Sequence, residues 1–193
     1  LGPVHAKAMD YFRKYLLIGG MPQVVKNFVE HRDFLKVDRE KRMILDLYRQ
    51  DIEKHGDRLE KKVKSIFDTI PAELQRHEKK FRLADLEKNA KFRSYESSFV
   101  WLDEARVVNL CYAATEPNVG LGLKLDNMRV KCYFADTGLL VSHAFDENEL
   151  MDNNLYQKLL LDKLEINKGM LVVNIVAQML AAAGHKLYFY SNA

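Results

Sequence analysis

The sequence predicts a mainly helical α+β fold, and three features lead to this prediction. In most of the 193 residues, apolar side chains recur with the period of an α-helix. Two runs, 107–114 and 128–135, instead have the short, mostly apolar pattern of β-strands. The composition, 48% hydrophobic and 30% charged, is that of an ordinary globular protein. We therefore expect one sizeable core or two small ones.

Three helices are predicted in the first segment, 1–56. The first ends at Gly19 and Gly20. The second begins at Pro22, because the missing N–H of a proline costs nothing in the first helical turn. The third has many charges between its apolar residues, so we expect it to be the longest exposed helix. It ends at Gly56, a residue type that commonly terminates helices.

The middle segment, 57–143, has the element order of a winged helix. Apolar spacing predicts a helix from Leu59 that breaks near Pro71, a short helix around Leu83 and a third helix from Ser94. The two strands follow, joined by a stretch too long for a tight hairpin. Three helices and a two-stranded ribbon are typical of a winged helix.

The last segment, 144–193, is predicted to contain an apolar helix followed by a strand. The helix stops at Gly184, and the strand covers 186–190. The apolar stretch 169–184 is shorter than the roughly 18 residues that a membrane span requires, so no membrane span is predicted.

No catalytic, cofactor-binding or metal site is predicted. Gly184, His185 and Lys186 resemble part of a phosphate loop, but the second glycine is absent and the run follows a helix instead of preceding one. Asp136 ends an apolar strand, as a magnesium-binding aspartate does in P-loop ATPases. Without a phosphate loop we interpret Asp136 as a cap for the next turn. Neither C-x-x-C nor H-x-x-x-H occurs, so no metal-binding residue is predicted.

Composition and cysteine usage bear on the compartment and the partner. Cys111 and Cys132 lie in apolar, strand-like surroundings, which predicts buried thiols in a reducing, cytoplasmic compartment. The net charge of +3 gives no reason to expect a basic surface over the whole molecule. Any nucleic-acid contact must therefore be local.

A local basic segment makes DNA a candidate partner. Between residues 76 and 93 there are seven Lys or Arg and three acidic residues. The helix that follows adds polar side chains, but its Glu96, Asp103 and Glu104 would repel a duplex. The alternative is a winged helix that only packs against a neighbouring domain. The candidate nucleic-acid residues are Lys79, Lys80, Lys88, Lys91, Arg93, Tyr95, Ser97 and Ser98.

Several stretches resemble a family of prokaryotic ATPases. The runs are YLLIGGMPQVV at 15–25, LYRQDI at 47–52 and KCYFADTGL at 131–139, and the stretches 167–178 and 184–190 resemble the start of the family's terminal domain. They resemble the C-terminal domain of unknown function that follows the P-loop core in AAA-type, archaeal-ATPase-like proteins. The signature residues in these runs, which we interpret as structural, are Gly19, Gly20, Pro22, Lys131, Asp136 and Gly138.

The resemblance implies a lid-like helical part at 1–56 and the start of a restriction-endonuclease-like α/β part at 144–193. It places ATP and Mg in a P-loop domain upstream in the same chain, with no cofactor in this segment. The helix Glu that the nuclease-like fold uses as a metal ligand is replaced by Val173, so no nuclease activity is expected.

These observations predict a regulatory or adaptor module of a P-loop ATPase, with no catalytic site of its own, that contacts DNA through its winged helix. The alternative is a protein–protein interaction domain without nucleic-acid binding. An oligomer is compatible with the sequence, which names neither the cellular process nor the protein partner.

Overall fold

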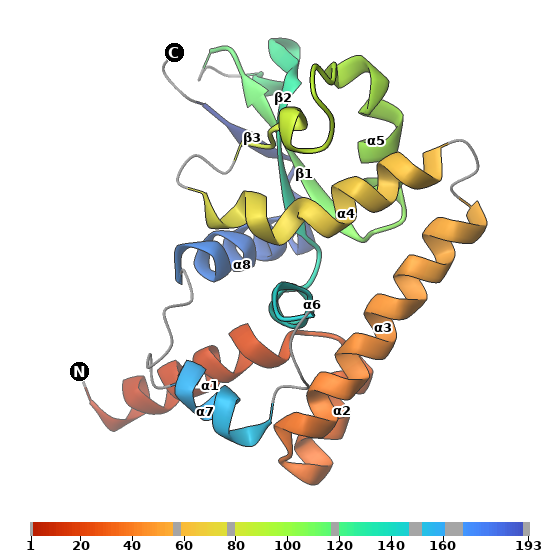
Figure 1. Cartoon of the computed structure of the whole chain (residues 1–193). Helices are drawn as coiled ribbons and strands as arrows, with labels where there is room; N and C mark the ends of the chain where they lie inside the picture. Colours follow the sequence, from red (N-terminus) through yellow and green to blue (C-terminus); the bar gives the residue numbers. More distant parts are fainter. Residues whose placement is uncertain are drawn as a thin grey trace. The chain divides into compact units, whose positions relative to one another are not determined.

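A computed structural model (Figure 1) describes residues 2–55, 59–76, 80–116, 120–146, 152–160 and 168–190. The described chain consists of helices and one three-stranded sheet, which confirms the predicted α+β class. It divides into two compact units. Unit 1 comprises residues 1–48 and 136–175, and unit 2 comprises residues 49–135 and 176–193. Gly56, the predicted stop of the third helix, lies outside the described residues.

Unit 1 is entirely helical in its described part. Its core includes a row of aromatic rings, with Phe34 placed between Phe28 at 5.0 Å and Tyr156 at 4.7 Å, measured between ring centroids. These rings join α2 and α3, which are consecutive in the sequence, to α7, which lies more than 100 residues later. The helices are α1 (Pro3–Ile18), α2 (Pro22–His31), α6 (Thr137–Ala144), α7 (Asn153–Leu160) and the first parts of α3 (Phe34–His55) and α8 (Lys168–Ala182).

Unit 2 contains the sheet, in which β1 is the central strand. β2 pairs with β1 antiparallel, and β3 pairs with its other edge in parallel. The backbone N–H of Phe81 donates to the carbonyl of Val130 on β2 at 2.9 Å. The elements are α4 (Glu60–Gln75), η2 (Leu83–Asp85), η3 (Phe92–Ser94), α5 (Glu96–Glu104), β1 (Val108–Ala114), η4 (Leu121–Leu123), β2 (Leu125–Phe134) and β3 (Leu187–Phe189).

The order α4, η2, α5, β1, β2 is the order expected for a winged helix, with two differences from the prediction. The predicted short second helix is a single 3-10 turn. The predicted break of helix α4 near Pro71 is wrong, because the helix continues to Gln75. Proline costs a helix one backbone hydrogen bond. Here Ile70, Pro71 and Leu74 are all buried, and we attribute the continuation of the helix to this packing.

The boundaries of the two units differ from those of the predicted segments 1–56, 57–143 and 144–193. Two of the three boundaries fall inside α3 and α8, so that each of these helices contributes to both units, and the third lies between β2 and α6. Residues 136–144 belong with the N-terminal helices, because α6 makes most of its contacts with α1. Sequence order alone cannot reveal such a discontinuous unit.

None of the helices in the described ranges combines the length and apolar character needed to cross a bilayer.

Candidate functional site

Asp136 lies at the centre of the signature residues of unit 1. It is the N-cap of α6, where one carboxylate oxygen accepts the N–H of Leu139 at 2.9 Å. The other oxygen accepts the N–H of Gly20, which follows α1, at 2.7 Å. The side chain is 3% exposed. One carboxylate thus caps a helix and ties it to a turn 116 residues earlier in the chain.

Two glycines allow α1 and α6 to approach closely. A Cβ at Gly138 would lie 2.2 Å from the carbonyl oxygen of Ile18 and 2.4 Å from the nitrogen of Gly19. A Cβ at Gly19 would lie 2.1 Å from Asp136, and the φ of Gly19, +84°, also favours glycine. Pro22 occupies the first turn of α2. These signature residues determine where the backbone passes.

Lys41 on α3 is fully buried beside this crossing. Its ammonium donates to the carbonyls of Leu17 at 2.8 Å and Gly138 at 3.1 Å, and to the hydroxyl of Tyr156 at 2.5 Å. A lysine ammonium has three donors, and all three are used here. Lys41 on α3 therefore links α1, α6 and α7 through three hydrogen bonds.

A second buried charge lies one turn away. Asp38 accepts the hydroxyl of Ser142 at 2.6 Å and the Nε–H of Arg42 at 2.9 Å, and its side chain is fully buried. In the same unit, the amide of Asn174 donates to the hydroxyl of Thr137 at 2.9 Å. The buried polar side chains of Asp38, Lys41 and Asn174 are hydrogen-bonded to other side chains or to backbone carbonyls, which indicates a structural role for them.

Asp38, Lys41 and Tyr156 are not among the site residues predicted from the sequence. Charges between apolar residues led to the expectation that the third helix is largely exposed. A signal was present, since position 41 falls on the same stripe as Val37 and Leu45, both fully buried. A lysine on the apolar face of a helix is a candidate for a buried, hydrogen-bonded ammonium.

Burial lowers the pKa of Lys41 to about 7, although the Asp38 and Asp136 carboxylates oppose this shift. In the unfolded chain a lysine has its ordinary pKa of about 10.4. Between about pH 7 and about pH 10 the unfolded state therefore binds more protons than the folded state, and the free energy of unfolding rises with pH. We expect Lys41 to contribute up to about 1.4 kcal/mol per pH unit.

Urea unfolding between about pH 7 and about pH 9, compared for the wild type and Lys41→Met, measures this contribution. The variant should lack the rise. Burial raises the pKa of Cys111 and Cys132, so these thiols make the free energy of unfolding fall as the pH rises. They do so in both the wild type and the variant. The difference between the two proteins therefore isolates Lys41. Equal pH slopes would contradict the lowered pKa.

The candidate nucleic-acid residues all belong to unit 2, but they do not form one exposed face. Lys88, Lys91, Arg93 and Ser97 are exposed, and Lys80 is partly exposed. Lys79 lies outside the described residues. The exposed cations occupy the turn after η2 and the η3 segment that leads directly into α5.

The predicted exposure of Tyr95 and Ser98 is wrong. Both side chains are buried, at 4% and 0% exposure. The hydroxyl of Tyr95 donates to Glu87 at 3.2 Å, and the Lys62 ammonium lies 5.0 Å from the centroid of the Tyr95 ring. The helical period turns both residues toward the unit 2 core, where Phe99 is also buried. Neither side chain is available to a duplex.

Lys131 lies on β2 in unit 2, so the 131–139 signature is divided between the units. Its ammonium lies 4.6 Å from the centroid of the Phe189 ring on β3, a cation–π contact. Cys111 and Cys132 are buried free thiols, as predicted. Cys132 pairs with Leu110 in the ladder, so the two cysteines point to opposite faces of the sheet.

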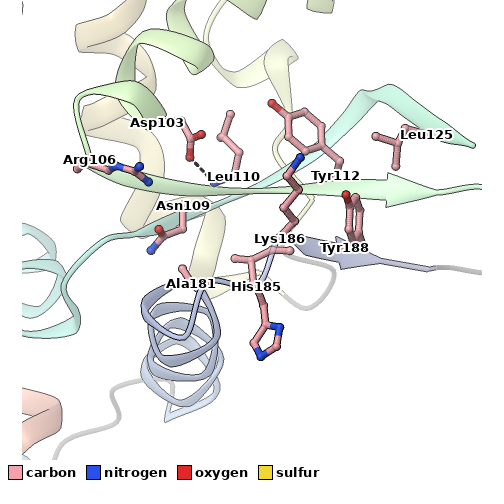
Figure 2. Close-up of a pocket in the computed structure, with 12 residues that line it drawn as sticks. Asp103, Arg106, Asn109, Leu110, Tyr112, Leu125, Ala181, His185, Lys186 and Tyr188 are labelled. Carbon is pink, nitrogen blue, oxygen red and sulfur yellow. Dashed lines mark hydrogen bonds between the residues drawn. The ribbon is translucent and has the colours of Figure 1, made fainter. Parts of the chain in front are cut away.

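Unit 2 also contains a pocket of about 560 Å³ (Figure 2). It is lined by the end of α5, by β1, and by the turn that leads from α8 into β3. None of its lining residues is among the predicted site residues, and Gly184, His185 and Lys186 belong to the incomplete phosphate-loop pattern. Within the described ranges, no three His, Cys, Asp or Glu side chains gather in a way that could hold a metal ion.

Comparison with protein families gives one match. The model of DUF8612, a domain of unknown function, matches residues 9–149. The chain belongs to this family. The matched range includes Asp38, Lys41, Asp136 and the basic segment 76–93, whereas α7 with Tyr156, α8 and β3 lie beyond it. No curated protein and no solved structure matches the chain.

Proposed function

We propose that this chain is a non-catalytic regulatory or adaptor module of a cytoplasmic P-loop ATPase, and that its winged-helix part contacts the phosphate backbone of duplex DNA. ATP and Mg would bind the P-loop domain of the same protein. The observation that carries the DNA contact is the position of Lys88, Lys91 and Arg93. All three are exposed and immediately precede α5, the third helix of the winged-helix order.

The nearby acidic groups are partly neutralised. Asp85 forms an ion pair with Arg76, and Glu87 accepts the hydroxyl of Tyr95. Exposed Glu96 at the start of α5 remains as a like charge to phosphate. This balance supports contacts to the DNA backbone from the segment before α5, and it gives no support to base reading by Tyr95 or Ser98.

The adaptor part of the proposal is supported by α1. Val4, Tyr11 and Tyr15 are 84%, 58% and 38% exposed, and they recur at helical spacing on one stripe. An exposed apolar stripe is typical of a protein contact surface. The same stripe supports the alternative, a module that binds only protein.

Replacing Lys88, Lys91 and Arg93 together by Gln should weaken binding to a labelled duplex at least about tenfold at low salt. Each lost phosphate contact should also flatten the dependence of log K on log salt by about 0.9. Fluorescence anisotropy over a salt series measures both. The matched control replaces Lys7, Lys26 and Lys36 of unit 1 by Gln, which removes the same charge.

Equal affinities of the two triple variants would show that only overall charge matters, which contradicts a site on the winged helix. The absence of any anisotropy change with the wild type at low salt would refute DNA binding and leave the protein-binding alternative.

A further inference from the structure

The pocket of unit 2 is the size of a small-molecule site. Its volume of about 560 Å³ falls within the range of roughly 300–1,000 Å³ that is usual for ligand pockets. The buried polar groups around Asp38, Lys41 and Asp136 in unit 1 are hydrogen-bonded to one another or to backbone. The pocket, by contrast, is an open space lined by side chains of several chemical types.

Two aromatic rings form part of its wall. Tyr112 on β1 and Tyr188 on β3 are direct partners in the parallel ladder. Directly paired residues project from the same face of a sheet, so both rings line the pocket from neighbouring strands. Both side chains are half-buried. Tyrosine rings in such positions are suited to stack on a planar group such as a nucleobase.

Two cations line the same pocket. Lys186 lies two residues before Tyr188, and its side chain extends from the start of β3 toward β1 (Figure 2). Arg106 follows α5 at the corner that leads into β1. Both residues are exposed. In Figure 2 the Lys186 side chain lies beside Tyr112, whereas Arg106 lies farther along β1 near the end of α5. An ammonium beside an aromatic wall is suited to bind the phosphate of a ligand whose planar group stacks there, and Arg106 adds a second positive charge to the lining.

One carboxylate lies in the pocket. An oxygen of Asp103 accepts the backbone N–H of Leu110 at 3.1 Å, so this hydrogen bond holds the carboxylate against the backbone of β1 (Figure 2). With Arg106 and Lys186 charged, the lining carries two positive charges against one negative charge at neutral pH. The formal balance favours an anionic ligand.

We propose that this pocket binds a nucleotide, either free or at the end of a single strand, with its base against Tyr112 and Tyr188 and its phosphate at Lys186, beside Tyr112 (Figure 2). This proposal uses none of the residues assigned to duplex binding and does not depend on it. The competing explanation is that the two cations only complement the partial negative charge at the carboxyl ends of α5 and α8.

Two-dimensional NMR of the ¹⁵N-labelled chain, titrated with AMP, adenosine and inorganic phosphate, tests the proposal. AMP should give saturable shifts in the amides of 106–112 and 184–188. Adenosine and phosphate should each bind at least about tenfold more weakly, because each makes only part of the contacts. The absence of saturable shifts in these amides at millimolar AMP would overturn the proposal.

Short single-stranded oligonucleotides with and without a 5′-phosphate separate the two sources of the nucleotide. Tighter binding of the phosphorylated strand than of AMP, lost without the phosphate, identifies a strand end. If AMP shifts the pocket amides and neither strand does, the ligand is a free nucleotide.

Lys186→Gln should weaken AMP binding about tenfold, whereas Lys61→Gln, which removes an equal charge from the exposed face of α4, should leave it unchanged. Equal weakening by both variants would overturn the site. Shifts confined to residues 88–93 would place the anion on the basic segment instead and likewise overturn it. Duplex binding, measured separately by anisotropy, can fail without affecting this outcome.

Discussion

Replacing Gly138 with alanine should destabilise unit 1 by about 3 kcal/mol, the upper part of the range for overpacked cores. The new Cβ would lie 2.2 Å from the carbonyl oxygen of Ile18 and 2.4 Å from the nitrogen of Gly19. Both atoms belong to backbone, so no side chain can rotate away. The expected sign is the reverse of the usual one, because alanine normally stabilises a helix relative to glycine by up to about 1 kcal/mol.

Urea unfolding followed by circular dichroism measures the loss, and hydrogen exchange in α1 and α6 localises it to unit 1. Gly2→Ala is the matched control, since no atom lies within 4 Å of a Cβ placed there. A Gly138→Ala protein as stable as the wild type would show that α1 and α6 do not approach each other this closely.

Replacing Asp136 with alanine should cost unit 1 about 3 kcal/mol as well. Loss of an N-cap costs about 0.5–2 kcal/mol, and a buried N–H left without its acceptor costs about 1–3 kcal/mol. Asp136→Ala causes both losses, at Leu139 and at Gly20. Asp136→Asn keeps one acceptor oxygen and should cost about half as much.

The same unfolding experiment distinguishes these variants from a general effect of lost charge. Asp10→Ala removes a carboxylate that forms only an exposed pair with Lys14, and it should change stability by less than about 1 kcal/mol. If Asp136→Asn is as damaging as Asp136→Ala, the negative charge matters more than the two hydrogen bonds.

The candidate site was predictable from the sequence only in part. The glycines and Asp136 could be selected because a Gly–Gly–x–Pro turn and an aspartate after a strand have known backbone roles. The buried cluster of Lys41, Asp38 and Tyr156 was not predicted. A charged residue in a helix usually lies on the solvent face, and only packing from α1, α6 and α7 buries these side chains.

The pocket could not be predicted either. Tyr112 and Tyr188 are 76 positions apart in sequence numbering, and they become neighbours only because β3 pairs with β1 in parallel. A strand of three residues carries too weak a pattern to specify its partner.

The sequence by itself determined the α+β class, the order of helices and strands between residues 59 and 134, the strands β1 and β2, and the buried thiols. These are local properties, because hydrophobic period, turn residues and strand propensity act over a few neighbouring residues. The tertiary structure decided the discontinuous units, the burial of Lys41, Tyr95 and Ser98, and the pairing of β3. Each depends on contacts between segments distant in sequence, and no local pattern encodes which segments meet.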